Sequence, residues 1–313
     1  MIKNILAIRN DRFGEFLLNI PAMRALKEVY PQAKLSLAVS SAVCELAGAV
    51  ECVDEAMVWD EVKGNLKKHK FDLCVVLNPT KEAHWAVFCG GIPVRVGYSR
   101  KWGFLLTHKL KDTKQLGDRH EVDCNLELVN LIASGASRPR NDGGLRFPNN
   151  DKYEFLAGAV AIHPFTSDLV KQWPVERFKE LAQRIKRELG LRVAMVGKNE
   201  IASAPAAPRN DGMGDGIVDM INKTSLVELA ALLKRCSLLI SCDSGPVHLA
   251  ASVGTPVVAL FRNDLLGKTA KRWGPWGDGH VVIEKGNLLD ISVDEVFDKV
   301  KQRLLRSPSA NSQ

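Results

Sequence analysis

Three short segments combine acidic, basic and hydroxyl side chains in patterns that could bind an anion and move a proton. In the first, Asp243, Ser244, Gly245 and His248 directly follow an apolar run. Ligands of open α/β sheets bind where strands end, and a helix that starts there presents free backbone N–H groups to an anion. Gly245 would let a bulky ligand approach the backbone. The alternative is an ordinary helix start, with Asp243 or Ser244 as the N-cap.

The second segment is a polar loop after an expected strand that ends at His163. Thr166 and Ser167 lie in this loop, and Lys171 follows them beside Trp173, just before a helix is expected. A lysine at a strand terminus could contact a phosphate group. The alternative is a solvated surface lysine, as most lysines are.

The third segment, residues 9–26, carries Asp11, Arg12 and Glu15 between an expected first strand and a helix. A carboxylate in this loop could face an anion site on another domain and act as a general base. Equally, Asp11 could cap the helix, and Glu15 could be a first-turn acid that the helix dipole stabilises.

The order of strands and helices decides where these segments meet. Strand-like and helix-like patterns alternate, which favours parallel βαβ units. The segment Ser137–Asn150 is rich in Pro, Gly, Asn and charge, as linkers are, and the alternation restarts after it. We therefore expect an α/β protein with two doubly wound Rossmann-like domains, residues 1–150 and 151–306, whose strand ends face a cleft. A disordered polar tail is expected at 307–313.

The expected strands are Lys3–Ile8, Lys34–Val39, Phe71–Leu77 and Val94–Tyr98 in the first domain, and Ala159–His163, Arg192–Val196, Ser237–Cys242 and Pro256–Phe261 in the second. The expected helices are Leu18–Val29, Lys81–Phe88, Glu121–Ala133, Val175–Leu189, Ser225–Lys234, Val247–Val253 and Leu288–Leu305. One of these helix starts carries a capping box, Ser225-x-x-Glu228.

Composition is that of a globular protein, with 46% hydrophobic and 25% charged residues. No apolar stretch reaches the ~18 residues that span a bilayer. Residues Met1–Arg9 are typical of a first strand rather than a secretory signal. The seven cysteines are odd in number and form no C-x-x-C pair, which is typical of reduced core residues. We expect a cytoplasmic protein without a zinc site, and no other metal or cofactor.

The formal net charge of +7 favours anionic partners. Aromatic residues make up only 6% of the chain and do not interleave with a basic stretch, which argues against nucleic acid. Residues Gly267–Thr269 read GKT, but a P-loop needs glycine at position 262, where Arg262 stands.

Seven segments, in order along nearly the whole chain, resemble glycosyltransferase family 9, the heptosyltransferases of lipopolysaccharide core assembly. They are "DRFGE…IPAMRALK" from Asp11, "RVGY" at Arg95–Tyr98, "HEVDCNLELV" at His120–Val129, "KQWPVERFKELA" at Lys171–Ala182, "SLVELAALL" at Ser225–Leu233, "DSGPVHLAASVGTPVVALF" at Asp243–Phe261 and "RWGPWG" at Arg272–Gly277.

This resemblance implies the GT-B fold and an inverting transfer of heptose from ADP-heptose to a lipopolysaccharide core acceptor. It makes Glu15 the catalytic base, with Asp11 as the alternative. It also implies that Lys171 and the helix start at Asp243, Ser244, Gly245 and His248 hold the donor diphosphate. Thr166 and Ser167 are further donor-side candidates, and Asp11, Arg12, Arg100 and Lys101 are acceptor-side candidates.

The chain departs from the family pattern at three places. Glu15 replaces a more usual aspartate, Phe165-Thr166 replaces small residues, and Arg262-Asn263 replaces Gly-Pro. The last two leave the donor open, so the alternative is another nucleotide-sugar transferase or an epimerase of the same fold. A non-catalytic nucleotide-sugar binder is a further alternative, although such a binder has no need of Glu15.

A lipid-linked oligosaccharide acceptor would bring the enzyme, which we expect to be a monomer, to the inner face of the cytoplasmic membrane. Residues 98–114 place Trp102 and Phe104 among basic side chains that include Arg100 and Lys101. Near an anionic surface such side chains contribute ~1 kcal/mol each, so a peripheral membrane contact is expected. The alternative is that Trp102–Leu106 is a buried strand.

Overall fold

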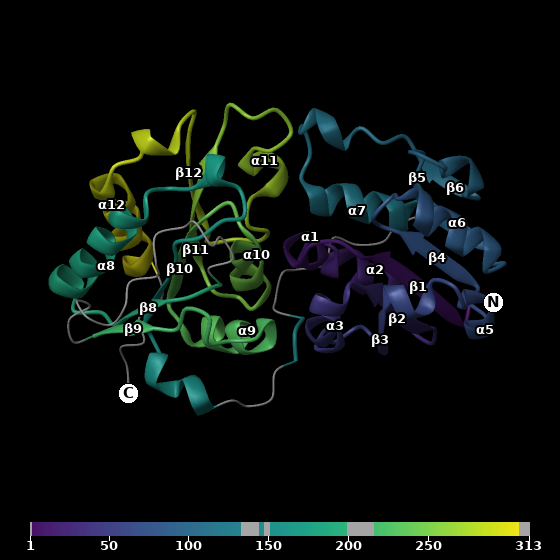
Figure 1. Cartoon of the computed structure of the whole chain (residues 1–313), viewed down its shortest axis with the longest axis horizontal. Coiled ribbons are helices and arrows are strands. Elements are labelled where there is room, and N and C mark those ends of the chain that lie inside the picture. Colours follow the sequence, from purple (N-terminus) through teal and green to yellow (C-terminus); the bar gives the residue numbers. More distant parts are fainter. Residues whose placement is uncertain (1, 133–143, 147–150, 199–215, 307–313) are drawn as a thin grey trace. The chain divides into compact units, whose positions relative to one another are not determined.

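The computed structural model describes residues 2–132, 144–146, 151–198 and 216–306. The chain forms two compact units, Met1–Arg146 and Phe147–Gln313 (Figure 1). Each unit contains a six-stranded sheet whose strands are all parallel within the described residues.

The first sheet runs in the order β3-β2-β1-β4-β5-β6. Its strands are β1 (Asn4–Arg9), β2 (Lys34–Val39), β3 (Glu55–Val58), β4 (Leu73–Val76), β5 (Val94–Tyr98) and β6 (His108–Leu110). The helices of this unit are α1 (Phe13–Leu17), α2 (Ile20–Val29), α3 (Ser41–Gly48), α4 (Trp59–Val62), α5 (Leu66–His69), α6 (Lys81–Cys89) and α7 (Glu121–Asn130), with the 3₁₀ turns η1 (Gly103–Leu105) and η2 (Lys114–Leu116).

The second sheet runs in the order β12-β11-β10-β7-β8-β9. Its strands are β7 (Val160–His163), β8 (Val193–Met195), β9 (Ile217–Asp219), β10 (Leu238–Cys242), β11 (Val257–Arg262) and β12 (Val281–Lys285). The helices are α8 (Val175–Leu189), α9 (Leu226–Arg235), α10 (Gly245–Ser252), α11 (Ala270–Trp273) and α12 (Val293–Leu305), with the 3₁₀ turns η3 (Asp151–Leu156), η4 (Leu169–Lys171) and η6 (Leu288–Asp290).

Both sheets have the same topology. In each, the first and fourth strands of the unit are neighbours, and the strand order reverses between them. This is the doubly wound Rossmann arrangement, whose ligands bind beyond the carboxyl ends of the strands at the reversal point. The predicted α/β fold class is therefore confirmed. The reversal points lie between β1 and β4 and between β7 and β10.

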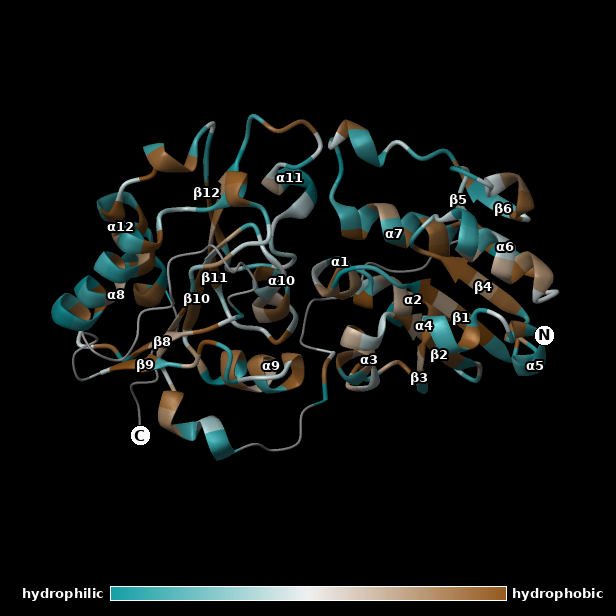
Figure 2. Ribbon diagram, in the orientation of Figure 1, coloured by the Kyte–Doolittle hydropathy of each residue, from teal (hydrophilic) through white to brown (hydrophobic). Residues whose placement is uncertain are grey.

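The sequence builds these sheets from short, nearly continuous apolar runs. Every residue of β4 and β10 is buried, as parallel strands covered on both faces require. In the second unit α8 and α12 pack against each other, as do α9 and α10, and the pairs cover opposite faces of the sheet (Figure 1). The hydropathy colouring shows the contrast between apolar strands and more polar covering helices, with β4 mostly brown and α8 largely teal (Figure 2).

Several predicted elements differ at their ends. The last helix begins at Val293 rather than Leu288, because Ser292 accepts a hydrogen bond from the Glu295 N–H and caps it there. Within the predicted linker, Gly144 and Arg146 are hydrogen-bonded to Glu51 and Ala49 of the first unit. Residues 137–143 and 147–150 of that linker and the tail at 307–313 lie outside the described residues.

None of the helices in the described part of the chain is long and apolar enough to cross a membrane.

Candidate functional site

The reversal point of the second sheet is lined by a chain of polar side chains. His163 ends β7 and lies opposite Ser241 of β10. Its Nδ1 is 3.0 Å from Ser241 Oγ, which is 2.9 Å from Ser244 Oγ. Burial lowers the pKa of His163 to about 4, so the imidazole is neutral near pH 7. His163 and Ser241 were missed as site residues, because only the pairing of β7 with β10 brings them together.

A glycine makes room for the His163 ring. Gly197, just after β8, has a φ of +111°, and a Cβ built on it would lie 2.2 Å from His163 Cδ2. Any larger residue would displace the imidazole and so disturb its contact with Ser241.

An ion pair lies next to these polar groups. The Lys171 ammonium donates to the carboxylate of Asp243, and the two side chains are 19% and 12% exposed. Burial raises the pKa of Asp243, and the neighbouring Lys171 opposes that rise. Asp243 therefore holds a lysine rather than capping α10. Ser244 occupies the N-cap position, but its side chain makes no capping hydrogen bond.

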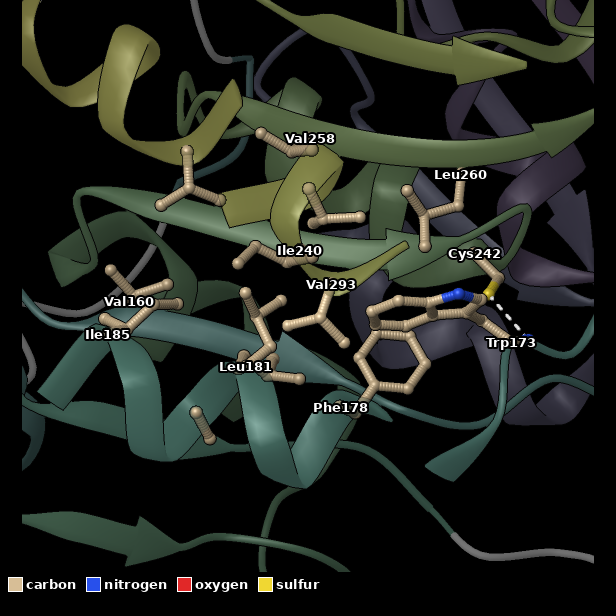
Figure 3. Close-up of a cluster of buried hydrophobic side chains, with 14 of the residues drawn as sticks. Val160, Trp173, Phe178, Leu181, Ile185, Ile240, Cys242, Val258, Leu260 and Val293 are labelled. Atoms are coloured by element: carbon tan, nitrogen blue, oxygen red, sulfur yellow. Dashed lines mark hydrogen bonds between the residues drawn. The ribbon is translucent and has the colours of Figure 1, made fainter. Parts of the chain in front are cut away.

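A buried tryptophan, Trp173, holds the loop that carries Lys171 against the end of β10. The Trp173 N–H donates to Cys242 Sγ at 3.3 Å, and its indole Nε1 donates to the Ile291 carbonyl at 3.0 Å. Phe178 packs edge-on against the indole, with the two ring centroids 4.8 Å apart (Figure 3). Since Cys242 directly precedes Asp243, this anchor places Lys171 beside the start of α10.

The remaining predicted donor residues fall into two groups. Gly245 begins α10, and His248 lies buried in its first turn. Thr166 is also buried, but its hydroxyl is engaged with the backbone of Asp168, so it shapes the loop. Ser167 is exposed in that loop.

Arg262, one of the departures from the family pattern, reaches the same edge of the sheet. It ends β11 and donates to the Val170 carbonyl at 3.3 Å while pairing with Asp264. Its guanidinium therefore lies next to the loop that carries Lys171. No motif predicts this contact, since the two residues are 92 positions apart.

The first unit has a charge network at its own reversal point. Arg9 ends β1, donates to Asp11 at 2.7 Å and to the Leu77 carbonyl at 3.1 Å, and lies 3.8 Å from Glu121. Glu121 in turn accepts from Lys114 at 2.6 Å. The sequence did not predict Arg9, Lys114 and Glu121 as site residues, because they belong to β1, η2 and α7, which only the fold brings together.

Glu15 lies in α1, directly after this network, and is half-buried. Burial is the largest cause that raises the pKa of its carboxyl, and the Asp11 carboxylate raises it further. Asp11 does not cap α1. The N-cap position is occupied by exposed Arg12, which makes no side-chain capping bond.

The other acceptor-side candidates are placed elsewhere on the first unit. Arg100 and Lys101 are exposed and follow β5, which is two strands away from β1. Arg100 lies 3.4 Å from Asp112. The structure thus places Asp11 and Glu15 in one loop-helix segment, and does not bring Arg100 or Lys101 to β1.

Among the described residues, no group of three or more His, Cys, Asp or Glu side chains is arranged to hold a metal ion.

The chain is similar to known glycosyltransferases. A family model described as glycosyltransferase family 9 (heptosyltransferase) matches residues 59–295. Lipopolysaccharide heptosyltransferase 3 of Escherichia coli K12 is 22% identical to this chain, covering 95% of it and 92% of the relative.

Two solved structures share the fold over nearly the whole chain. One is a family 9 glycosyl transferase from Veillonella parvula, with a TM-score of 0.85, 20% identity and coverage of 97% of this chain and 98% of that one. The other is the E. coli ADP-heptose LPS heptosyltransferase II, with a TM-score of 0.83, 20% identity and coverage of 98% and 100%. At these identities the likeness supports the fold.

Proposed function

Because the chain belongs to glycosyltransferase family 9 and is therefore a glycosyltransferase, we propose that it moves a heptose from ADP-heptose to a lipopolysaccharide core acceptor, with inversion at the anomeric carbon. The relatives named above include a lipopolysaccharide heptosyltransferase and an enzyme named for ADP-heptose. The observation that carries the proposal is the Lys171–Asp243 ion pair at the start of α10.

The donor diphosphate is proposed to bind at this ion pair. Asp243 holds the Lys171 ammonium beside the N-terminus of α10, where the helix dipole also favours an anion. Charge develops on the diphosphate as it leaves, and donors fixed in advance stabilise that charge without reorganisation. The Arg262 guanidinium, which is paired with Asp264, lies at the same edge.

Glu15 is proposed as the general base. Its raised pKa brings the carboxylate nearer to the operating pH, which makes it a better proton acceptor. Glu15 takes the proton of an acceptor hydroxyl, and that oxygen forms a bond to the anomeric carbon. The bond from this carbon to the diphosphate oxygen breaks on the opposite side, and ADP leaves with the electron pair. Attack opposite to the leaving group inverts the configuration.

Two alternatives remain distinguishable by experiment. Another nucleotide-sugar transferase or an epimerase would keep the diphosphate contacts and change the sugar or base. A non-catalytic binder would keep the donor site without turnover. We further propose that the enzyme is a monomer and works at the inner face of the cytoplasmic membrane, where a lipid-linked acceptor is available.

The donor site is tested by separating the diphosphate from the nucleoside. We expect Lys171→Ala to weaken ADP binding about tenfold or more, the usual scale for a lost charge-assisted hydrogen bond. Adenosine binding should hardly change, because adenosine lacks the diphosphate. Isothermal titration with both ligands measures the difference.

Two further variants serve as controls for the Lys171→Ala measurement. Lys171→Met with Asp243→Asn removes both charges, so that an unpaired carboxylate cannot by itself repel ADP. Lys179→Ala removes another partly buried, ion-paired lysine of the same unit and should leave ADP affinity unchanged. Equal losses of ADP and adenosine affinity in the Lys171 variants would place the diphosphate elsewhere.

A further inference from the structure

Four aromatic side chains of the first unit lie exposed on two neighbouring segments, and three of them are in contact. Trp85 and Phe88 come from α6, and Trp102 and Phe104 come from the segment around η1. They are 52%, 45%, 37% and 71% exposed. The Trp85 ring centroid is 6.0 Å from that of Phe88 and 5.9 Å from that of Trp102. We call these four residues the aromatic surface.

The aromatic surface is not the edge of the core. On α6 the core-facing side chains are Ala83, Ala86 and Val87, which pack with the sheet. Trp85 and Phe88 are three positions apart and share the outward face of that helix. Large aromatics gathered on a surface cost free energy in water, and such patches mark interaction sites. The alternative that Trp102–Leu106 forms a buried strand is wrong, since Gly103–Leu105 is a 3₁₀ turn and both aromatics are exposed.

Positive charge borders the aromatic surface. Lys81 Nζ lies 5.9 Å from the Trp102 ring centroid, and Arg95 Cζ lies 5.7 Å from that of Phe88. Residues 81–111 contain one acid, Glu82, and its carboxylate pairs with Lys63 at 2.7 Å. The same stretch contains the basic residues Lys81, Arg95, Arg100, Lys101, Lys109 and Lys111.

We propose that the aromatic surface inserts into the interfacial region of an anionic lipid bilayer, with the surrounding cations on the lipid headgroups. Tryptophan suits the interface because its ring is apolar and its N–H is polar. The aromatic residues that the sequence predicted for this contact are Trp102 and Phe104; the structure adds Trp85 and Phe88 of α6. The inference rests on the proposed function only in that a lipid-linked acceptor gives the enzyme a reason to dock.

Charge complementarity favours a bilayer over a second copy of this chain. Two copies meeting through the aromatic surface would bring their basic borders together, and like charges at an interface are repulsive. An anionic bilayer offers the opposite charge and an apolar interior to the same side chains. It is therefore the partner whose chemistry matches both features.

Vesicle sedimentation tests the proposal on the full chain. We expect binding to phosphatidylcholine vesicles that contain phosphatidylglycerol, weaker binding at high salt, and little binding to phosphatidylcholine alone. Trp85→Ser with Phe104→Ser should lower the partition coefficient about tenfold or more, because it removes an apolar group from each element. Phe155→Ser, at a 48% exposed phenylalanine of the second unit, should leave it unchanged.

A label next to the aromatic surface reports the contact directly. Cys89 is exposed and follows Phe88, whereas the other cysteines are partly or fully buried. A polarity-sensitive fluorophore on Cys89 should shift to the blue with phosphatidylglycerol vesicles, and Cys89→Ser checks that labelling is specific.

Three results would overturn the proposal: no sedimentation at low salt, binding that the double variant does not weaken, or self-association that this variant abolishes. Transfer to a soluble, delipidated acceptor should survive in the double variant. Loss of vesicle binding with intact transfer therefore separates this inference from the proposed function.

Discussion

Glu15 has the most specific chemical role proposed for any residue, that of the general base, and its replacement by an amide of the same shape tests that role. Glu15→Gln should lower kcat by ~10²-fold or more, as removal of a general base usually does. The Kd for ADP should stay nearly constant, because the proposed donor contacts belong to the second unit. Steady-state kinetics and titration measure the two quantities. Glu15→Asp keeps a carboxylate and should retain more activity than the glutamine variant. A parallel collapse of ADP binding and turnover would mark Glu15 as structural.

Asp11 should tune the base rather than replace it. Its carboxylate raises the pKa of Glu15, while Arg9 lowers it. Asp11→Asn removes the negative charge and frees Arg9 of its 2.7 Å partner, so both changes lower that pKa. The acidic limb of the kcat/KM profile, which reports the free enzyme's base, should therefore move to lower pH. If Asp11 were itself the base, the variant would lose most activity and no shifted limb would be measured.

At the residue scale, the sequence could predict side chains that act close to their own strand end. Asp243 directly follows β10, and Glu15 and Lys171 lie in the segments that follow β1 and β7. The topology of a parallel sheet brings the segments after its strands to one edge. The sequence could not predict partners that folding brings together from afar. Trp173 bonds to Ile291, 118 positions away, and Arg262 reaches Val170.

At the scale of elements, strong periodicity or a continuous apolar run predicted the bounds well. Lys34–Val39, Val94–Tyr98 and Val175–Leu189 are observed with the predicted ends. The unpredicted strands β3, β6, β9 and β12 are the edge strands of the two sheets, and each contains partly exposed residues. All three residues of β9 are partly exposed and two of the three in β6 are exposed. Such segments lack the apolar alternation by which strands are recognised.

The first helix is another element that pattern alone did not resolve. The prediction of one helix over Leu18–Val29 missed α1, which ends at Leu17, and the start of α2 at Ile20. Pro21 follows that start directly, where a proline is tolerated because its missing N–H is not needed. Asn19 donates to the Glu15 carbonyl at 2.5 Å between the two helices. This break is what leaves Glu15 on a short separate turn.

At the scale of the whole molecule, the two units repeat one strand order and use their reversal points for different chemistry. The first carries a carboxylate with a raised pKa beside the Arg9 network, and the second carries the Lys171–Asp243 pair at a helix start. The restart of the pattern after the linker was visible in the sequence. The identity of the transferred sugar was not visible in the sequence, because the chain departs from the family pattern at positions such as Arg262.

The anomeric configuration of the product tests the proposed inverting heptose transfer. The enzyme is incubated with ADP-heptose and a delipidated lipopolysaccharide core acceptor that lacks the heptose, and the product is examined by nuclear magnetic resonance. We expect one added heptose per acceptor, one ADP released for each, and an anomeric configuration opposite to that of the donor. Retention of the donor's configuration, or transfer from a different nucleotide sugar with none from ADP-heptose, would contradict it.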